Sequence, residues 1–291
     1  MKDARGADGR RRIDRWSEVS WIVSGFNRNR KSTVNPPWLI CVDESMVAWT
    51  GQGCPNLSFV PRKPGPLDIE VKNACDGCSG VMLHLEIQDN KVHACMHLHK
   101  NVYDLCLLVQ EMMARKKYRD RYSASVATTL RLVKFANEKR VTKEDRVDRV
   151  VVADSWFTSV STAEALWGEF AIKFIGNVKT ATRKFPVEDM RWMLHQGGRG
   201  DICVYTSDSG DLFGVGWHVH HYKTFVANAG STQWATPAKK KRQRDDGSNY
   251  WREVPRPGVC EIYYSANGKI DQNNRTRQYL LKLEKTWATN R

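Results

Sequence analysis

The segment RVVVADSWFTS, residues 149–159, decides the fold class of this chain. Its consecutive valines are typical of a short strand that is buried on both faces of a sheet. Asp154 follows the valines directly, where a polar side chain can reach the edge of the sheet. The segment therefore predicts an inner strand of a layered α/β fold with a carboxylate at its end.

Helical patterns flank this strand on both sides. Residues 123–140 place apolar side chains on one face and predict an amphipathic helix that opens at Ser123. The stretch STAEALWGEF (161–170) predicts a second helix, with Ser161 as N-cap and Glu164 completing a capping box. Helices on both sides of a buried strand indicate a mixed α/β layer fold.

Short β-rich segments bounded by Gly, Pro, Asn or Asp make up the rest of the expected sheet. Those before the valine strand predict an antiparallel meander, and one follows the second helix. These segments are WLICVD (38–43), LSFVP (57–61), DIEVKNAC (68–75), VMLHLEI (81–87) and FAIKFIGNVK (170–179).

Composition and the predicted elements divide the chain into four parts. Residues 1–37 form a basic lead-in with a short helix, a remnant of an N-terminal region, and residues 38–179 form the first part of the core. Residues 180–258 are expected to be a β-rich insertion with an aromatic strand at 211–227 and a basic loop. Residues 259–291 then supply the final core helix.

The charge balance points to a polyanionic partner. Lys and Arg number 46 against 32 Asp and Glu, a formal net charge of +14. Such an excess suits nucleic acid, although a basic balance can also serve solubility alone. The amino terminus has no apolar stretch, and we expect an intracellular protein with no membrane partner. Eight cysteines are too sparse for a disulfide scaffold and are expected to be thiols.

Three aspartates occupy positions where a metal site could form. Asp43 ends the first core strand, Asp154 ends the valine strand, and Asp271 opens the last helix in GKIDQNN. Polar residues beyond neighbouring strand ends share one edge of a sheet, and two-metal phosphoryl chemistry needs several carboxylates. Each aspartate, considered alone, is more often a turn former or a helix cap.

Four motifs carry a resemblance to a known family. VDESMVAWTG resembles the opening strand motif of piggyBac-type transposases, and VADSWFTS resembles their Asp-Asn-Phe-Phe-Thr-Ser motif. FVPRKPGPLDIEVK is similar to their Pro-Asn-Lys-Pro stretch, and YYSANGKIDQNN to their Tyr-Asn-x-x-Met-Gly-Gly-Val-Asp-x-x-Asp. The motifs occur in family order over roughly residues 35–290, so the chain resembles the DDE catalytic domain of piggyBac transposases and piggyBac-derived proteins.

The resemblance implies an RNase H-like mixed sheet with flanking helices and a β-rich insertion before the last catalytic helix. It implies that Asp43, Asp154 and Asp271 are both the catalytic residues and the metal ligands. Two Mg²⁺ ions, or alternatively Mn²⁺, would act in DNA strand cleavage and strand transfer. The implied partners are DNA and a second copy of the chain, and the implied location is the nucleus.

Two departures from the family pattern weaken the expected metal site. Asn274 replaces a second aspartate, and Lys269 replaces a glycine beside Asp271, where a cation could compete with metal. Only about 40 residues precede Asp43 and the chain stops at Arg291, which predicts a fragmentary or degenerate copy. A catalytically inactive nuclear DNA- or chromatin-binding protein and a different RNase H-like nuclease remain alternatives.

Residues 238–244, AKKKRQR, form a compact basic run. The run suits a nuclear import signal or phosphate contacts, with import preferred, and a solvated loop is the plainer reading. Three tryptophans nearby, Trp217, Trp234 and Trp251, could stack on unpaired bases or pack in the core. The residues expected to contact DNA are Lys239, Lys240, Lys241, Arg242 and Arg244.

A second cluster has the composition of a zinc site. A Cys-x-x-Cys pair with nearby imidazoles supplies suitable ligands, but the alternating spacing of the later members is typical of one face of a strand. Surface strand residues are therefore the favoured interpretation. The members are Cys75, Cys78, His84, His93, Cys95, His97 and His99.

Overall fold

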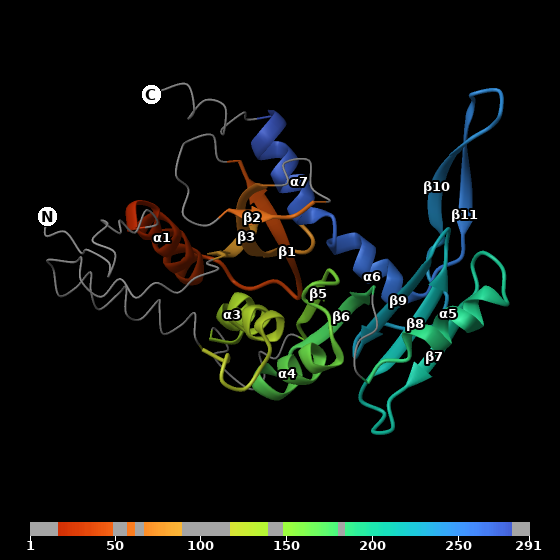
Figure 1. Ribbon diagram of the computed structural model, residues 1–291, viewed down its shortest axis with the longest axis horizontal. Helices are drawn as coiled ribbons and strands as arrows, with labels where there is room; N and C mark the ends of the chain where they lie inside the picture. The colour runs from red at the N-terminus through yellow and green to blue at the C-terminus, as the bar shows by residue number, and fades with distance from the viewer. Residues whose placement is uncertain are drawn as a thin grey trace, which may run out of the picture.

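The computed structural model describes residues 17–48, 57–61, 67–88, 117–138, 148–179 and 184–280 (Figure 1). Its helices are α1 (Ser17–Thr33), α3 (Ala124–Glu138), α4 (Val160–Phe170), α5 (Val187–His195), α6 (Gly258–Ala266) and α7 (Lys269–Arg275), followed by a π-helical turn η1 (Thr276–Leu280). Its strands are β1 (Leu39–Val47), β2 (Ser58–Phe59), β3 (Leu67–Asp76), β4 (Met82–Ile87), β5 (Val150–Ala153), β6 (Lys173–Val178), β7 (Ile202–Thr206), β8 (Phe213–His218), β9 (Tyr222–Ala227), β10 (Ala238–Gln243) and β11 (Asn249–Val254). Among these helices, none is long and apolar enough to cross a lipid bilayer.

Nine of these strands form one mixed sheet. Its order is β2-β3-β1-β5-β6-β9-β8-β7, and β4 also pairs with β3. The β1–β5 and β5–β6 pairs are parallel, and the other pairs are antiparallel. All four residues of β5 are buried, so the valine run is an inner strand. The expected mixed sheet with flanking helices is confirmed.

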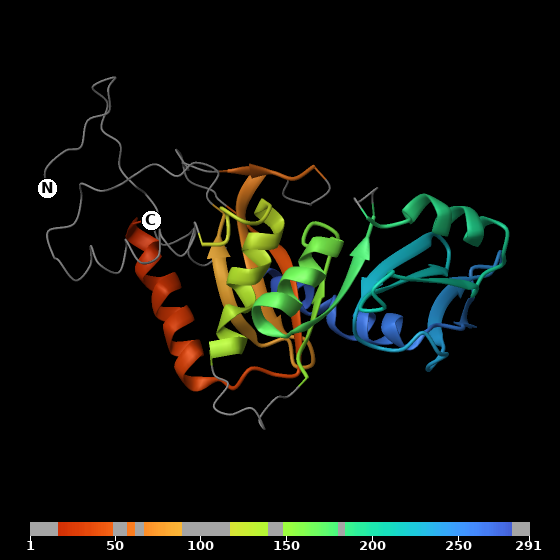
Figure 2. The same cartoon turned by 90° about the horizontal axis from the view of Figure 1, so that it is seen from below.

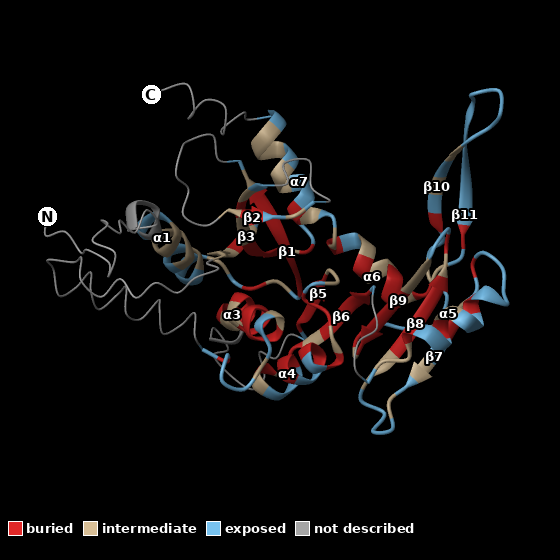
Figure 3. Cartoon of the chain, in the orientation of Figure 1, coloured by how far each residue is buried: buried red, intermediate tan, exposed pale blue. Residues whose placement is uncertain are grey.

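Helices cover both faces of the sheet. Ile40 and Val42 of β1 pack with α3 and α4, whereas Leu39 and Cys41 pack with α6 on the other side. Figure 2 shows α3 and α4, yellow-green and green, in front of the sheet and the blue C-terminal helices behind it. Buried residues concentrate in the inner strands between these layers (Figure 3). The fold therefore has two apolar layers, one on each side of the sheet.

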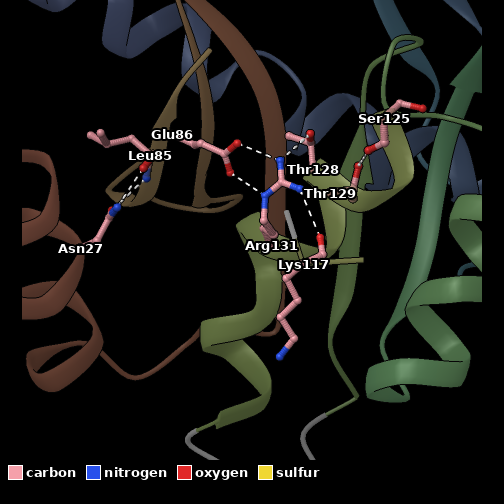
Figure 4. Close-up of polar contacts among 8 residues, drawn as sticks. All are labelled: Asn27, Leu85, Glu86, Lys117, Ser125, Thr128, Thr129 and Arg131. Atoms are coloured by element: carbon pink, nitrogen blue, oxygen red, sulfur yellow. Dashed lines mark hydrogen bonds and ion pairs between the residues drawn. The ribbon is translucent and has the colours of Figure 1, made fainter. Parts of the chain in front are cut away.

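Helix α1, which the sequence suggests is a short remnant, is 17 residues long and docks on strand β4. The Asn27 amide donates to the backbone oxygen of Leu85 at 2.8 Å and accepts from its backbone N–H at 3.0 Å (Figure 4). The guanidinium of Arg131 on α3 donates twice to the Glu86 carboxylate, at 3.0 and 2.8 Å. The Asn27 contacts satisfy backbone groups of Leu85 that an edge strand would otherwise expose, and the Arg131–Glu86 pair ties β4 to α3.

The second predicted helix begins two residues earlier than its sequence pattern indicates. The N-cap is Ser159, whose hydroxyl accepts from the Thr162 backbone N–H at 3.0 Å, so the assignment of Ser161 and Glu164 as a capping box is wrong. Ser161 lies exposed in the first turn. Phe157 and Val160 are both buried in the core, and their packing fixes the start of the helix.

The aromatic stretch 211–227 is a hairpin of β8 and β9 rather than one strand. Strand β9 pairs with β6, so these strands continue the core sheet. Residues 237–248, expected to be a loop, contribute β10, which pairs with β11 in a separate two-stranded ribbon. Figure 1 shows this ribbon projecting from the body of the molecule. The domain boundaries at 180 and 258 stay a prediction.

Candidate active site

The three predicted aspartates line one cavity of about 210 Å³. Asp43 comes from β1, Asp154 follows β5, and Asp271 lies in the first turn of α7. The other lining residues come from the end of β6, from β9 and from α6: Asn177, Lys179, Lys223, Tyr263, Tyr264 and Asn267. A larger cavity of about 830 Å³ lies between α4, β7 and β8 and is lined by none of the three aspartates.

Strand register brings the first two aspartates together. Val42 of β1 is the parallel partner of Ala153 of β5, and each aspartate is the next residue along the chain. The prediction that the first strand ends at Asp43 is wrong, because β3 pairs with β1 as far as Val47. Asp43 is therefore held inside a strand, which restricts its movement more than a loop would.

Burial and neighbouring charges act on Asp43. Its side chain is 8% exposed. Burial raises the pKa of Asp43 well above its usual range, and the negative charges of Glu44, Asp154 and Asp271 raise it further. One hydrogen bond, from the Glu44 backbone N–H at 2.8 Å, opposes the shift. The cavity thus concentrates negative charge that a bound cation would neutralise.

Lys179, at the end of β6, forms an ion pair with Asp154. Its ammonium lies 3.3 and 3.4 Å from the two carboxylate oxygens of Asp154. The lysine is 45% exposed and the aspartate 21%. Lys179 therefore provides a counter-ion to Asp154 at the position where a metal ligand is expected.

Two tyrosines of α6 form another wall of the cavity. Burial raises the pKa of Tyr264 to about 12 and raises the pKa of Tyr263 further still. Both phenols are consequently protonated at neutral pH and can donate a hydrogen bond. Neither can act as a general base there.

The donor set fits a hard divalent cation. Carboxylates, with the amide oxygens of Asn177 and Asn267 beside them, are the oxygen ligands that Mg²⁺ prefers. Within the described ranges, however, no three acidic, histidine or cysteine side chains converge closely enough to hold an ion. The three aspartates are thus brought to one cavity but not into one coordination shell, and Asp154 is turned toward Lys179.

The two departures near Asp271 lie away from the cavity lining. Lys269 lies beside Gly80 in the β3–β4 turn. There burial opposes a lowering of the pKa of Asp76 that comes first from hydrogen bonds from Ser79 and Cys78 and last from the charge of Lys269. Asn274 does not line the cavity either. The expectation that Lys269 competes with metal is therefore wrong, and Lys179 is the lysine next to a site carboxylate.

The zinc candidates within the described residues do not gather. Cys75 is buried against Cys41 in the layer beneath α6, Cys78 is exposed, and His84 stacks on Phe135 of α3 on the opposite face. The other predicted ligands, His93, Cys95, His97 and His99, lie outside the described residues.

The fold places the three tryptophans near the basic run in different environments. The five predicted DNA-contacting residues, Lys239, Lys240, Lys241, Arg242 and Arg244, lie on β10 and just beyond it. Trp217 is fully buried and its indole donates to the Pro255 oxygen at 2.8 Å, so it is a core residue. Trp234 and Trp251 are 58% and 66% exposed.

Sequence reasoning missed Lys179, Lys223 and the two tyrosines. One signal could have found Lys179. It ends the segment FAIKFIGNVK as Asp154 ends the valine strand, and the carboxyl ends of neighbouring parallel strands share one edge of a sheet. Lys223 and the tyrosines give no such signal, because they reach the cavity from β9 and α6.

Comparisons with known proteins agree with this fold. A family model described as Transposase IS4 matches residues 2–291. Among solved structures, the chain is similar to the piggyBac transposase in a cryo-EM structure of its synaptic complex with hairpin DNA, with a TM-score of 0.63 and 14% identity. That match covers 91% of this chain and 45% of the other, and it shows a shared fold. No curated protein matches. Because the family model spans nearly the whole sequence, the chain belongs to the Transposase IS4 family.

Proposed function

We propose that this chain is the catalytic part of a piggyBac-type DNA transposase that cleaves and rejoins DNA with divalent metal, most simply Mg²⁺. One observation carries the proposal: Asp43, Asp154 and Asp271 come from three separate elements and line one cavity. Such convergence is what metal-assisted chemistry at a phosphodiester needs. DNA as the partner is supported by the net charge of +14 and by the family.

A bound divalent ion would activate an attacking water or 3′-hydroxyl and stabilise the leaving oxygen. The ionised form of Asp43, which is held within β1 and lies near other negative charges, would be stabilised most by such an ion. Asp154, which pairs with Lys179, would be a second carboxylate to hold the ion. The ammonium groups of Lys179 and Lys223, which line the same cavity, would attract the phosphate oxygens, and the phenols of α6 would donate hydrogen bonds to them.

The test is Mg²⁺-dependent cleavage of a DNA duplex by the full chain. Asp154→Asn should abolish cleavage. Asp148→Asn is the matched control, since it removes the same charge before β5, where Asp148 pairs with Lys173 at 2.9 Å. The control should cleave at the rate of the unaltered protein. Equal cleavage by Asp154→Asn and the unaltered protein would overturn the proposal.

A second function has its own supporting observation. The ion pair between Lys179 and Asp154 fits a catalytically inactive transposase-derived protein that binds DNA or chromatin in the nucleus. This alternative predicts DNA binding without cleavage at any Mg²⁺ concentration. A fluorescent fusion of the full chain would test the nuclear location that both functions require.

A further inference from the structure

The two faces of the β10–β11 ribbon differ in charge. Opposed residues of an antiparallel pair point to the same side, and residues two apart on a strand do so too. Lys240 opposes Arg252, and Arg242 opposes Tyr250. The guanidinium of Arg244 lies 5.1 Å from the Tyr250 ring centre, which places it on the same side. We name this side, with Lys240, Arg242, Arg244 and Arg252, the arginine face; it has four cations and no acid.

The other side of the ribbon is less basic. Lys239 opposes Glu253, with the ammonium 3.9 Å from the carboxylate. Lys241 opposes Trp251, which is 66% exposed. We name this side, with Lys239, Lys241, Trp251 and Glu253, the lysine face; its two cations are offset by one acid.

The arginine face points toward the aspartate cavity. Ala238 and Val254 lie on this side at the base of the ribbon, and both are buried in the apolar layer that contains Tyr263. The ammonium of Lys240 lies 5.4 Å from the ring centre of Tyr264, and Tyr264 lines the cavity. The row of cations therefore starts at the wall of the cavity and runs outward along the ribbon.

The spacing of the cations and a hydrogen-bond donor without a partner both suit binding to phosphate. Alternate residues of a strand are about 6.6 Å apart, which is about the rise of two nucleotides along the helix axis of B-DNA. The Nε of Arg242 is buried and has no hydrogen-bond partner among the described residues. A rotation of the side chain that exposes Nε would let a phosphate oxygen accept from it, since a guanidinium binds phosphate through two N–H groups at once.

We infer that the arginine face binds the phosphodiester backbone of the duplex DNA whose cleavage site lies in the aspartate cavity. The inference rests on the proposed function and assigns the sequence's basic run to one side of the ribbon. An import receptor would need the run as a released extended peptide. Here it is paired with β11 from Ala238 to Gln243, and the Arg244 backbone N–H also donates to Ser248 at 2.8 Å.

The test compares two double variants of the full chain that remove the same charge from opposite sides of the ribbon. Arg242→Gln with Arg252→Gln alters the arginine face, and Lys239→Gln with Lys241→Gln alters the lysine face. Binding to a fluorescent DNA duplex is measured by anisotropy over a range of salt concentrations. Losing two phosphate contacts should lower the salt slope by about 1.8 and the affinity about 30-fold at 0.15 M salt. The lysine-face variant should stay within about threefold of the unaltered protein.

Thermal unfolding shows whether both variants remain folded. If the arginine-face variant does not, the exposed single change Arg252→Gln replaces it, with an expected slope loss of about 0.9. Equal losses from both faces would overturn the inference, because the ribbon would then act only through its total charge. Unchanged DNA affinity with reduced nuclear accumulation of both variants would also overturn it, in favour of an import signal.

Failure of this inference and failure of the proposed function give different results. If Asp154→Asn still cleaves DNA while the arginine-face variant binds weakly, the proposed chemistry is wrong and the binding face stands. If Asp154→Asn abolishes cleavage while the arginine-face variant binds normally, the chemistry stands and the face is wrong.

Discussion

Replacing Lys179 by methionine should tighten the binding of Mg²⁺ to the isolated protein. The ammonium of Lys179 lies 3.3 Å from one oxygen of Asp154, so an ion bound by Asp154 must displace it. Methionine keeps an apolar stem of similar length and removes the charge. The substitution therefore removes a competitor for the carboxylate without opening a cavity.

The expected size of the effect follows from the exposure of the pair. The lysine is 45% and the aspartate 21% exposed, so solvent screens much of their attraction. Ion pairs of this kind contribute about 0.5–1 kcal/mol, which corresponds to an about two- to fivefold lower dissociation constant for the metal. Removing one positive charge from the cavity acts in the same direction.

Isothermal titration with Mg²⁺ and with Mn²⁺ measures the change. Lys173→Met is the matched control, because Lys173 lies at the other end of β6 and pairs with Asp148 at 2.9 Å. It removes the same charge away from the cavity and should leave metal affinity unchanged. Weaker metal binding by Lys179→Met, or the same gain in both variants, would refute the competition.

Three other substitutions test the site and the fold. Asp43→Asn should stabilise the metal-free protein at pH 7. Burial and neighbouring charge raise the folded pKa of Asp43, so the wild type loses stability as pH rises from about 3.9 through that pKa. Urea unfolding in EDTA should show that the difference in unfolding free energy between the variant and the wild type vanishes below about pH 4. Ser159→Ala should cost about 1 kcal/mol of unfolding free energy through the lost cap of α4, whereas Ser161→Ala should cost less than about 0.5, and equal costs would contradict the assigned cap. Arg131→Met leaves the Glu86 carboxylate without its two charged hydrogen bonds, in a site where both side chains are nearly buried. Urea unfolding should show an unfolding free energy lower by about 3 kcal/mol. A cost under about 1 kcal/mol would show that the packing of α3 on β4 does not depend on this pair.

Local pattern was enough where burial itself dictates the structure. The valine run could only be an inner strand, because its side chains have no polar face to present to water. The amphipathic helix opens at Ser123 as expected, with α3 beginning at Ala124. Asp154 and Asp271 lie where their local sequence places them, directly after a strand and in the first turn of a helix.

Local sequence pattern gave wrong predictions where packing between distant segments decides the structure. The first strand continues past Asp43 because β3 pairs with it, and that pairing is not visible in either segment alone. The cap of α4 is at Ser159 because Phe157 and Val160 are drawn into the core, although Ser161 and Glu164 match the capping motif better. The basic run forms a strand because β11 supplies its hydrogen-bond partners.

By itself, the sequence predicted the class of the fold and singled out three aspartates that the structure brings to one cavity. Only the tertiary structure decided that Lys179 rather than Lys269 accompanies them, and that the cations of the ribbon divide into two unequal faces. The physical reason is the same in both cases. Which side chains meet depends on strand register and on the face to which each residue points, and a shift of one residue reverses that face.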